Sequence, residues 1–151
     1  MGAESFFRIP VLGSFLRLLG GFPVERELSD RAALKAAQSL LESGDSLVLF
    51  PEGTRMSGPI IGDIKEGAAF LACRAGVPII PVGLGGTERA FPKGGWWVRP
   101  SKVGIIVGDP IMPPNAGSDR RAKRSEVAAM SNEVRDSLQE LFDRAGLLVG
   151  K

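Results

Sequence analysis

The chain has 151 residues, 44% of them hydrophobic and 24% charged, a composition that suits one globular domain and excludes wholesale disorder. Its formal net charge of +2 is too small to indicate a nucleic-acid partner. The single cysteine, Cys73, cannot form an internal disulfide, and without any histidine the chain offers no zinc-type ligand set. We therefore expect a single domain over residues 1–151, a reducing compartment, and neither metal nor nucleic acid.

The first third of the chain predicts two helices around a short strand. Residues 6–19 are apolar at roughly helical spacing, although Pro10 and Gly13 interrupt them, so we expect a short or broken helix. Residues 22–24 predict a short strand. The next helix is capped by Ser29 or Asp30 and stops at Gly44. Its apolar residues share one face: Ala33, Leu34, Ala37, Leu40 and Leu41.

The remainder of the chain alternates apolar runs with helical segments. The runs predicted as buried strands are residues 46–50, 79–84 and 103–107. A helix over residues 66–75, stopped by Gly76, separates the first two, and an amphipathic helix over residues 121–144 follows the third. Buried parallel strands are continuously apolar and are joined by helical crossovers. The pattern therefore predicts an α/β fold with a largely parallel sheet and helices packed on it.

Four chemistry-bearing residues follow the predicted strand 46–50. In open parallel sheets, ligands bind outside the carboxyl ends of the strands, which makes Glu52, Gly53, Thr54 and Arg55 a candidate site. Gly53 permits close backbone approach and Thr54 offers a hydroxyl. Arg55 is suited to hold a phosphate in a bidentate fork, while Glu52 orients that arginine or a substrate hydroxyl. The alternative is a structural ion pair between Glu52 and Arg55 that closes the loop.

Two further cations are candidates for the same site. Arg26 follows the predicted strand 22–24 and reaches the same crevice if the two strands are neighbours. Lys65 stands at the start of the helix 66–75, where a cation opposes the helix dipole unless an anion offsets it. The alternative for each is an ordinary solvated side chain.

Other conspicuous residues admit both structural and membrane interpretations. Cys73 has no histidine to activate it, so we expect a buried, inert thiol. Trp96 and Trp97 are either an interfacial anchor or part of the core. The basic run at residues 120–124 either meets anionic headgroups or is solvated. Because no apolar run approaches the ~20 residues needed to cross a bilayer, any membrane contact should be peripheral.

Three segments, in order and spacing, carry a family resemblance. Residues 21–26 (GFPVER), 50–55 (FPEGTR) and 77–82 (VPIIPV) resemble the second, third and fourth motifs of the glycerolipid acyltransferases. The nearest match is the lysophosphatidic acid (1-acylglycerol-3-phosphate) acyltransferases. Residues 65–67 (KEG) and 108–111 (GDPI) are also similar to the family. One small departure is Met56, where a serine commonly follows the arginine.

The resemblance implies phospholipid biosynthesis at the cytoplasmic face of a membrane, by a peripheral protein without a bound cofactor. Acyl-CoA or acyl carrier protein would donate a fatty acyl group to the hydroxyl of a lysophospholipid, usually lysophosphatidic acid. The implied ligands of the acceptor phosphate are Arg26, Glu52, Gly53, Thr54, Arg55 and Lys65. The implied acyl-donor side is formed by Pro78, Ile79 and Pro81.

The first motif of the family, a histidine with an aspartate five residues on, has no counterpart in this chain. An attacking alcohol must lose its proton, and a base with a pKa near neutrality is the efficient acceptor. We therefore expect an N-terminally truncated acyltransferase fold, a partial domain with little turnover alone, whose missing segment is supplied in cis or in trans. The alternatives are a non-catalytic phospholipid-binding module and an unstable fragment without function.

Overall fold

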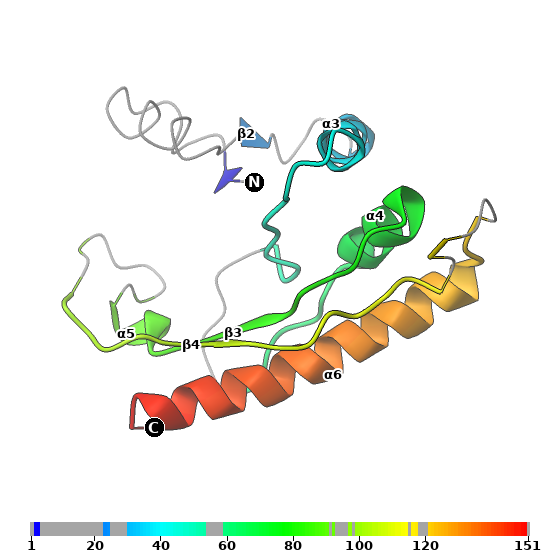
Figure 1. Ribbon diagram of the computed structural model, residues 1–151. Helices are drawn as coiled ribbons and strands as arrows, with labels where there is room; N and C mark the ends of the chain where they lie inside the picture. The colour runs from blue at the N-terminus through cyan, green and yellow to red at the C-terminus, as the bar shows by residue number, and fades with distance from the viewer. Residues whose placement is uncertain are drawn as a thin grey trace. The chain divides into compact units, whose positions relative to one another are not determined.

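A computed structural model describes residues 2–3, 23–24, 30–53, 59–90, 92, 97, 99–114, 116–117 and 121–150 (Figure 1). They fall into two compact units, Met1–Phe50 and Pro51–Lys151. The predicted helix over residues 6–19 lies outside the described residues, as do Arg26, Thr54 and Arg55.

The described residues of the first unit form a two-stranded parallel pair and one helix. β1 (Gly2–Ala3) pairs with β2 (Pro23–Val24), which confirms the predicted short strand. Helix α3 (Asp30–Glu42) is where the apolar spacing predicts it, and Ala37 on its apolar face is fully buried. The helix ends as predicted at Gly44, which has a φ of 86° and donates its N–H to the carbonyl oxygen of Leu41 over 3.1 Å.

Residues 46–50 are neither helix nor strand, so the predicted buried strand is wrong for this segment. Leu47 and Leu49 are half-buried, whereas Val48 and Phe50 are 70% and 66% exposed. This alternation is typical of extended chain with one covered side. A strand also needs a hydrogen-bonded neighbour, and an apolar run in the sequence does not reveal whether one is present.

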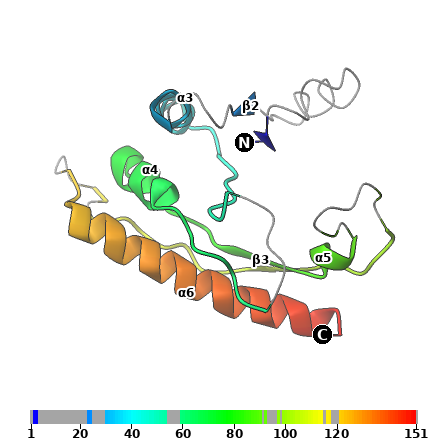
Figure 2. The same ribbon diagram turned by 180° about the vertical axis from the view of Figure 1, so that it is seen from behind.

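The second unit is built around an antiparallel strand pair and a long helix. Its elements in chain order are α4 (Gly67–Ala75), β3 (Val82–Gly85), α5 (Thr87–Ala90), β4 (Gly104–Val107) and α6 (Arg124–Leu148). β3 and β4 pair from Val82 opposite Val107 to Gly85 opposite Gly104. Both views show α6 running along the strand pair and beside α4 (Figures 1 and 2). The described elements are thus of the α/β class, as predicted.

The pairing of β3 with β4 is antiparallel rather than parallel, in contrast to β1 and β2. The connection between β3 and β4 holds only the four-residue helix α5 in its described part. Residues 86–103 are enough for a parallel crossover, which needs a dozen or more residues, so the length of the connection does not decide the direction of β4. The connection instead reverses the chain direction, which the apolar patterns of the two strands do not reveal.

Glycines on one face of the strand pair allow α6 to approach closely. A Cβ on Gly83 would collide with the carbonyl group of Leu141, and one on Gly85 with that of Ala145. The other face carries Ile105 and Val107, which are 61% and 63% exposed. The strand predicted over residues 103–107 is present as β4, but it is buried on one face only, since α6 covers that face and the other is apolar and exposed.

The hydrophobic core of this unit lies between α4 and α6. It contains Ala69, Ala72, Cys73, Ile111, Val127, Met130 and Val134, with Leu138 packed against it. α4 stops as predicted at Gly76, which has a φ of 69° and donates its N–H to the carbonyl oxygen of Ala72. At the start of α6, Lys123 N–H donates to the carboxylate of Glu126 over 2.7 Å. The predicted apolar stripe of the last helix is confirmed.

Candidate functional site

Two hydrogen bonds hold residues 51–53 beside residues 62–65. The N–H of Lys65 donates to the carbonyl oxygen of Pro51 over 3.0 Å. The N–H of Gly62 donates to Oε2 of Glu52 over 2.9 Å. Glu52 is half-buried, so its carboxylate is fixed by a backbone donor rather than free in solvent.

The side chain of Lys65 lies over the backbone of Gly53. A Cβ placed on Gly53 would be 3.5 Å from Cε and 3.8 Å from Nζ of Lys65. Gly53 has a φ of 65°, a conformation that glycine adopts without strain. Among the described residues no carboxylate forms an ion pair with Lys65, and its side chain is exposed. The ammonium is therefore available to an anion that approaches this loop.

The structure thus brings together three of the residues predicted to bind the acceptor phosphate: Glu52, Gly53 and Lys65. Lys65 precedes Glu66, the N-cap of α4, as the sequence predicts. The other three predicted ligands, Arg26, Thr54 and Arg55, belong to the undescribed part of the chain. Their roles stay predictions.

Two of the residues predicted for the acyl-donor side, Ile79 and Pro81, anchor the segment that leads into β3. Ile79 exchanges two backbone hydrogen bonds with Ile111, of 2.9 and 2.8 Å, and packs against the core between α4 and α6. The carbonyl oxygen of Pro81, which is buried, accepts from Gly108 N–H over 2.9 Å. Pro78 is exposed. Ile79 and Pro81 therefore have a structural function, and a role toward the acyl donor remains a prediction.

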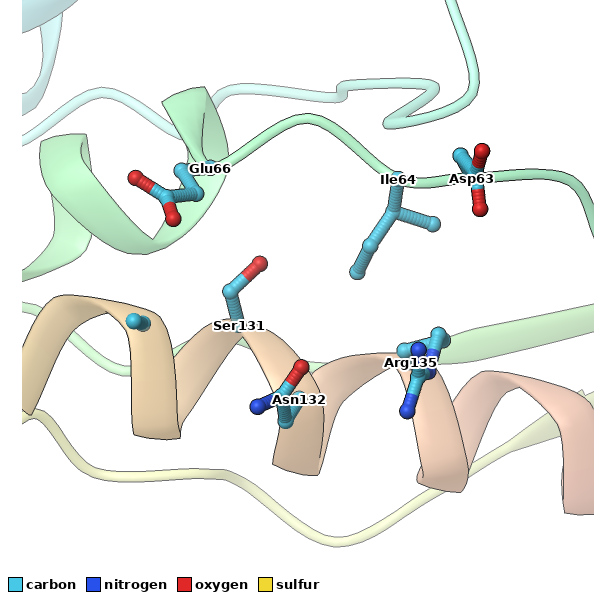
Figure 3. A pocket seen from close by; sticks show the side chains of 7 residues that line it. Asp63, Ile64, Glu66, Ser131, Asn132 and Arg135 are labelled. Atoms are coloured by element: carbon cyan, nitrogen blue, oxygen red, sulfur yellow. The ribbon is translucent and has the colours of Figure 1, made fainter.

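A pocket of about 320 Å³ lies between residues 63–66 and α6 (Figure 3). Its lining consists of Asp63, Ile64, Glu66, Ala128, Ser131, Asn132 and Arg135. In Figure 3, the side chain of Ile64 points toward α6 and the hydroxyl of Ser131 points toward the facing segment. Lys65 is not part of this lining, because its side chain lies against Gly53. Within residues 63–66, Lys65 therefore faces the Gly53 loop, and the other side chains line the pocket.

Residues that hold the site in place were not predicted from the sequence. Gly62 binds the carboxylate of Glu52, and Gln139 of α6 binds the backbone of Pro59 and Ile61. Neither residue stands in a recognisable motif. Their contacts join segments about 10 and 80 residues apart, which no local pattern reveals.

Cys73 is 4% exposed and contacts Met130, with its Sγ donating to Sδ over 3.7 Å. Burial, and to a smaller extent the negative charge of Glu126, raises the pKa of the Cys73 thiol above its ordinary value. The expected burial of Cys73 is confirmed, and since a protonated, buried thiol is a poor nucleophile, its inertness stays a prediction. Among the described residues no group of three potential metal-binding side chains is found, and none of the described helices combines the length and apolarity needed to span a membrane.

Comparison with known proteins defines the class of this chain. The family model described as Acyltransferase matches residues 1–85, more than half of the sequence, and the chain belongs to this family. It is 33% identical over 131 residues to the chloroplastic 1-acyl-sn-glycerol-3-phosphate acyltransferase BAT2 of Brassica napus, a match that covers 85% of the chain and 38% of that protein. The 1-acyl-sn-glycerol-3-phosphate acyltransferase of Bacillus subtilis is 28% identical over 147 residues, covering 95% of the chain and 68% of that protein.

A solved structure supports the same family assignment. The crystal structure of the 1-acyl-sn-glycerophosphate (LPA) acyltransferase PlsC from Thermotoga maritima matches with a TM-score of 0.68 and 28% identity, over 93% of this chain and 55% of that one. These findings confirm an α/β acyltransferase fold and a glycerolipid acyltransferase whose matched relatives are named 1-acylglycerol-3-phosphate acyltransferases. The chain spans only 36% to 39% of the plant and algal relatives that it matches with more than 30% identity over about 130 residues.

Proposed function

We propose that the chain is the acceptor-binding part of a 1-acylglycerol-3-phosphate O-acyltransferase. Such an enzyme moves a fatty acyl group from the thioester of coenzyme A or acyl carrier protein to the free hydroxyl of lysophosphatidic acid. The observation that carries the proposal is the meeting of Glu52, Gly53 and Lys65 on two hydrogen-bonded segments. The names of the matched relatives support the same acceptor.

Each residue has a distinct task in this proposal. The ammonium of Lys65 binds the phosphate of lysophosphatidic acid through charge-assisted hydrogen bonds, and Gly53 leaves room for the phosphate to approach the backbone. Glu52, fixed by Gly62, accepts a hydrogen bond from the glycerol or orients Arg55. Arg26, Thr54 and Arg55 add ligands to the phosphate.

The acyl-donor side is assigned to Pro78, Ile79 and Pro81. In the reaction, the acceptor oxygen attacks the thioester carbonyl, the C–S bond breaks, the thiolate leaves, and the hydroxyl proton passes to a base. The chain contains no histidine, and a missing general base typically costs about 10²–10⁴ in rate. We therefore propose that residues 1–151 alone turn over slowly, and that a further segment, in cis or in trans, supplies the base at the cytoplasmic face of a membrane.

Calorimetric titration of the chain with a soluble short-chain lysophosphatidic acid tests the proposal. The matched monoacylglycerol, which lacks the phosphate, should bind far more weakly. Lys65→Ala should weaken lysophosphatidic acid binding about tenfold, because a hydrogen bond to a charged group typically contributes ~1.5 kcal/mol or more. Lys102→Ala removes the same charge from an exposed position outside the site and should change the affinity little. Equal binding of the two lipids would contradict the proposal.

A non-catalytic phospholipid-binding module is the second candidate, favoured by the absence of histidine from the chain. Transfer of a labelled acyl group separates the two functions. If the native gene product, isolated from its own cells, binds lysophosphatidic acid but transfers no acyl group, it is a binding module. If it does transfer, it is the enzyme.

A further inference from the structure

The side chain of Gln139 joins α6 to the segment that follows the candidate site. Its Oε1 accepts from the N–H of Ile61 over 2.9 Å, and its Nε2 donates to the carbonyl oxygen of Pro59 over 3.2 Å. Nε2 also donates to Oδ2 of Asp143, one turn further along α6, over 3.2 Å. Both ends of the amide are engaged, so its orientation is fixed on the helix and the backbone of residues 59–61 is fixed against it.

The next residue in the chain holds the carboxylate of the candidate site. Gly62 follows Ile61 directly, and its N–H donates to Oε2 of Glu52 over 2.9 Å. The N–H of Gly62 belongs to the peptide unit next to the one that Gln139 holds, so only the φ and ψ of Ile61 separate the two. Three residues later, Lys65 N–H bonds the carbonyl oxygen of Pro51. The segment that carries Lys65 and orients Glu52 is thus tied to α6 at one end and to the loop at the other.

α6 does not depend on Gln139 for its own packing. The helix is held by apolar residues, among them Val134 and Leu141, which are both 3% exposed. Gln139 is half-buried, and its polar contacts with the described residues are those to the backbone of Pro59 and Ile61 and to Asp143. Its removal should therefore loosen the 59–62 segment more than it destabilises the helix.

We infer that Gln139 is a positioning residue for the acceptor site, acting through residues 59–62 on the carboxylate of Glu52. The inference rests on the proposed function, because Glu52 matters for binding only if the acceptor binds at this loop. α6, which the family motifs do not include, thereby contributes to acceptor affinity without touching the lipid.

The test replaces Gln139 by leucine, which keeps a similar bulk and removes both hydrogen bonds. Glu140→Leu is the matched control, since Glu140 is exposed and its ion-pair partner among the described residues is Arg144, over 3.3 Å. Amide hydrogen exchange measured by nuclear magnetic resonance reports the hydrogen bond of Gly62, and calorimetry reports affinity for short-chain lysophosphatidic acid. Gln139→Leu should raise the exchange rate of Gly62 several-fold and weaken binding about fivefold to tenfold, while α6 amides stay protected.

Gln139→Glu keeps an acceptor for Ile61 and loses the donor to Pro59. Its Gly62 exchange rate and its affinity should therefore lie between those of the unsubstituted chain and of Gln139→Leu. It also decides the question if Gln139→Leu fails to fold. Unchanged exchange at Gly62, or faster exchange with unchanged affinity, overturns the inference. If the unsubstituted chain does not bind lysophosphatidic acid, the proposed function fails, and the exchange rate of Gly62 still shows whether Gln139 holds this segment.

Discussion

The backbone N–H of Lys65 donates to the carbonyl oxygen of Pro51, and this pairing brings the lysine side chain over the loop that contains Gly53. The cation is therefore placed by main-chain geometry, without a carboxylate partner among the described residues. An ion pair would neutralise the charge that an anionic substrate requires. In the proposed function, this arrangement keeps the ammonium of Lys65 available for the phosphate of the acceptor.

Gly53→Ala should destabilise this loop. At a φ of 65° a residue with a Cβ is strained by roughly 1 kcal/mol, and the added Cβ would lie 3.5 Å from Cε of Lys65, an ordinary contact. We expect the free energy of unfolding in urea to fall by about 1 kcal/mol. Gly67→Ala, in the first turn of α4 with no atom within 4 Å of the new Cβ, should leave stability unchanged or raise it by about 0.5 kcal/mol. Equal free energies of unfolding for Gly53→Ala and Gly67→Ala would show that a Cβ at residue 53 causes no backbone strain.

Gly83→Ala should be far more damaging. The new Cβ would meet the carbonyl group of Leu141 in α6, a backbone group that does not move without shifting the helix. Such overpacking costs about 3 kcal/mol. A large drop in the thermal midpoint is expected, and an unchanged midpoint would show that α6 does not pack on β3 as described.

Cys73 should react slowly with thiol reagents in the native chain. Burial and the charge of Glu126 raise the pKa of its thiol, so little thiolate is present at pH 8. Ellman's reagent should label the urea-unfolded chain quickly and the native chain slowly, with Cys73→Ala as the blank. Rapid labelling of the native chain would contradict this burial.

The same pKa shift predicts a loss of stability at alkaline pH. Between the unfolded pKa, near 9.0, and the higher folded pKa, the native state keeps the thiol proton that the unfolded state has released. The free energy of unfolding should therefore decrease as pH rises above about 9. Cys73→Ala should remove that part of the dependence, and an identical decrease in this variant would assign it to other groups.

Apolar repeats and terminal glycines in the sequence predicted α3, α4 and α6. Gly44 and Gly76 end α3 and α4 with positive φ, as their positions after apolar helical repeats indicate. The stripe containing Val127, Met130 and Val134 identified the buried side of α6. For α3 and α4, one stretch of sequence contains both the apolar helical repeat and the glycine that ends the helix.

Pairing and coverage of strands were less predictable. β3 and β4 are antiparallel, with Val82 opposite Val107. This orientation depends on the direction taken by the connecting segment, which is rich in glycine. The apolar run predicts a buried strand over residues 79–84, but it does not reveal that the glycines of β3 make room for α6. Residues 46–50 are apolar enough for a strand, but their sequence contains no information about a partner.

The candidate site was predicted in part. Motif order placed Glu52, Gly53 and Lys65 together, and the structure places them on paired segments. The contribution of Gln139 was not predictable, because a glutamine on the polar side of a helix is indistinguishable in sequence from a solvated one. Only the folded chain brings its amide to Pro59 and Ile61.

A crystal structure of the chain soaked with short-chain lysophosphatidic acid tests the central claim most directly. We expect the phosphate within hydrogen-bond distance of Lys65 Nζ, at the loop formed by Glu52 and Gly53. A phosphate bound instead in the pocket beside Arg135 of α6, with Lys65 left in solvent, would contradict it.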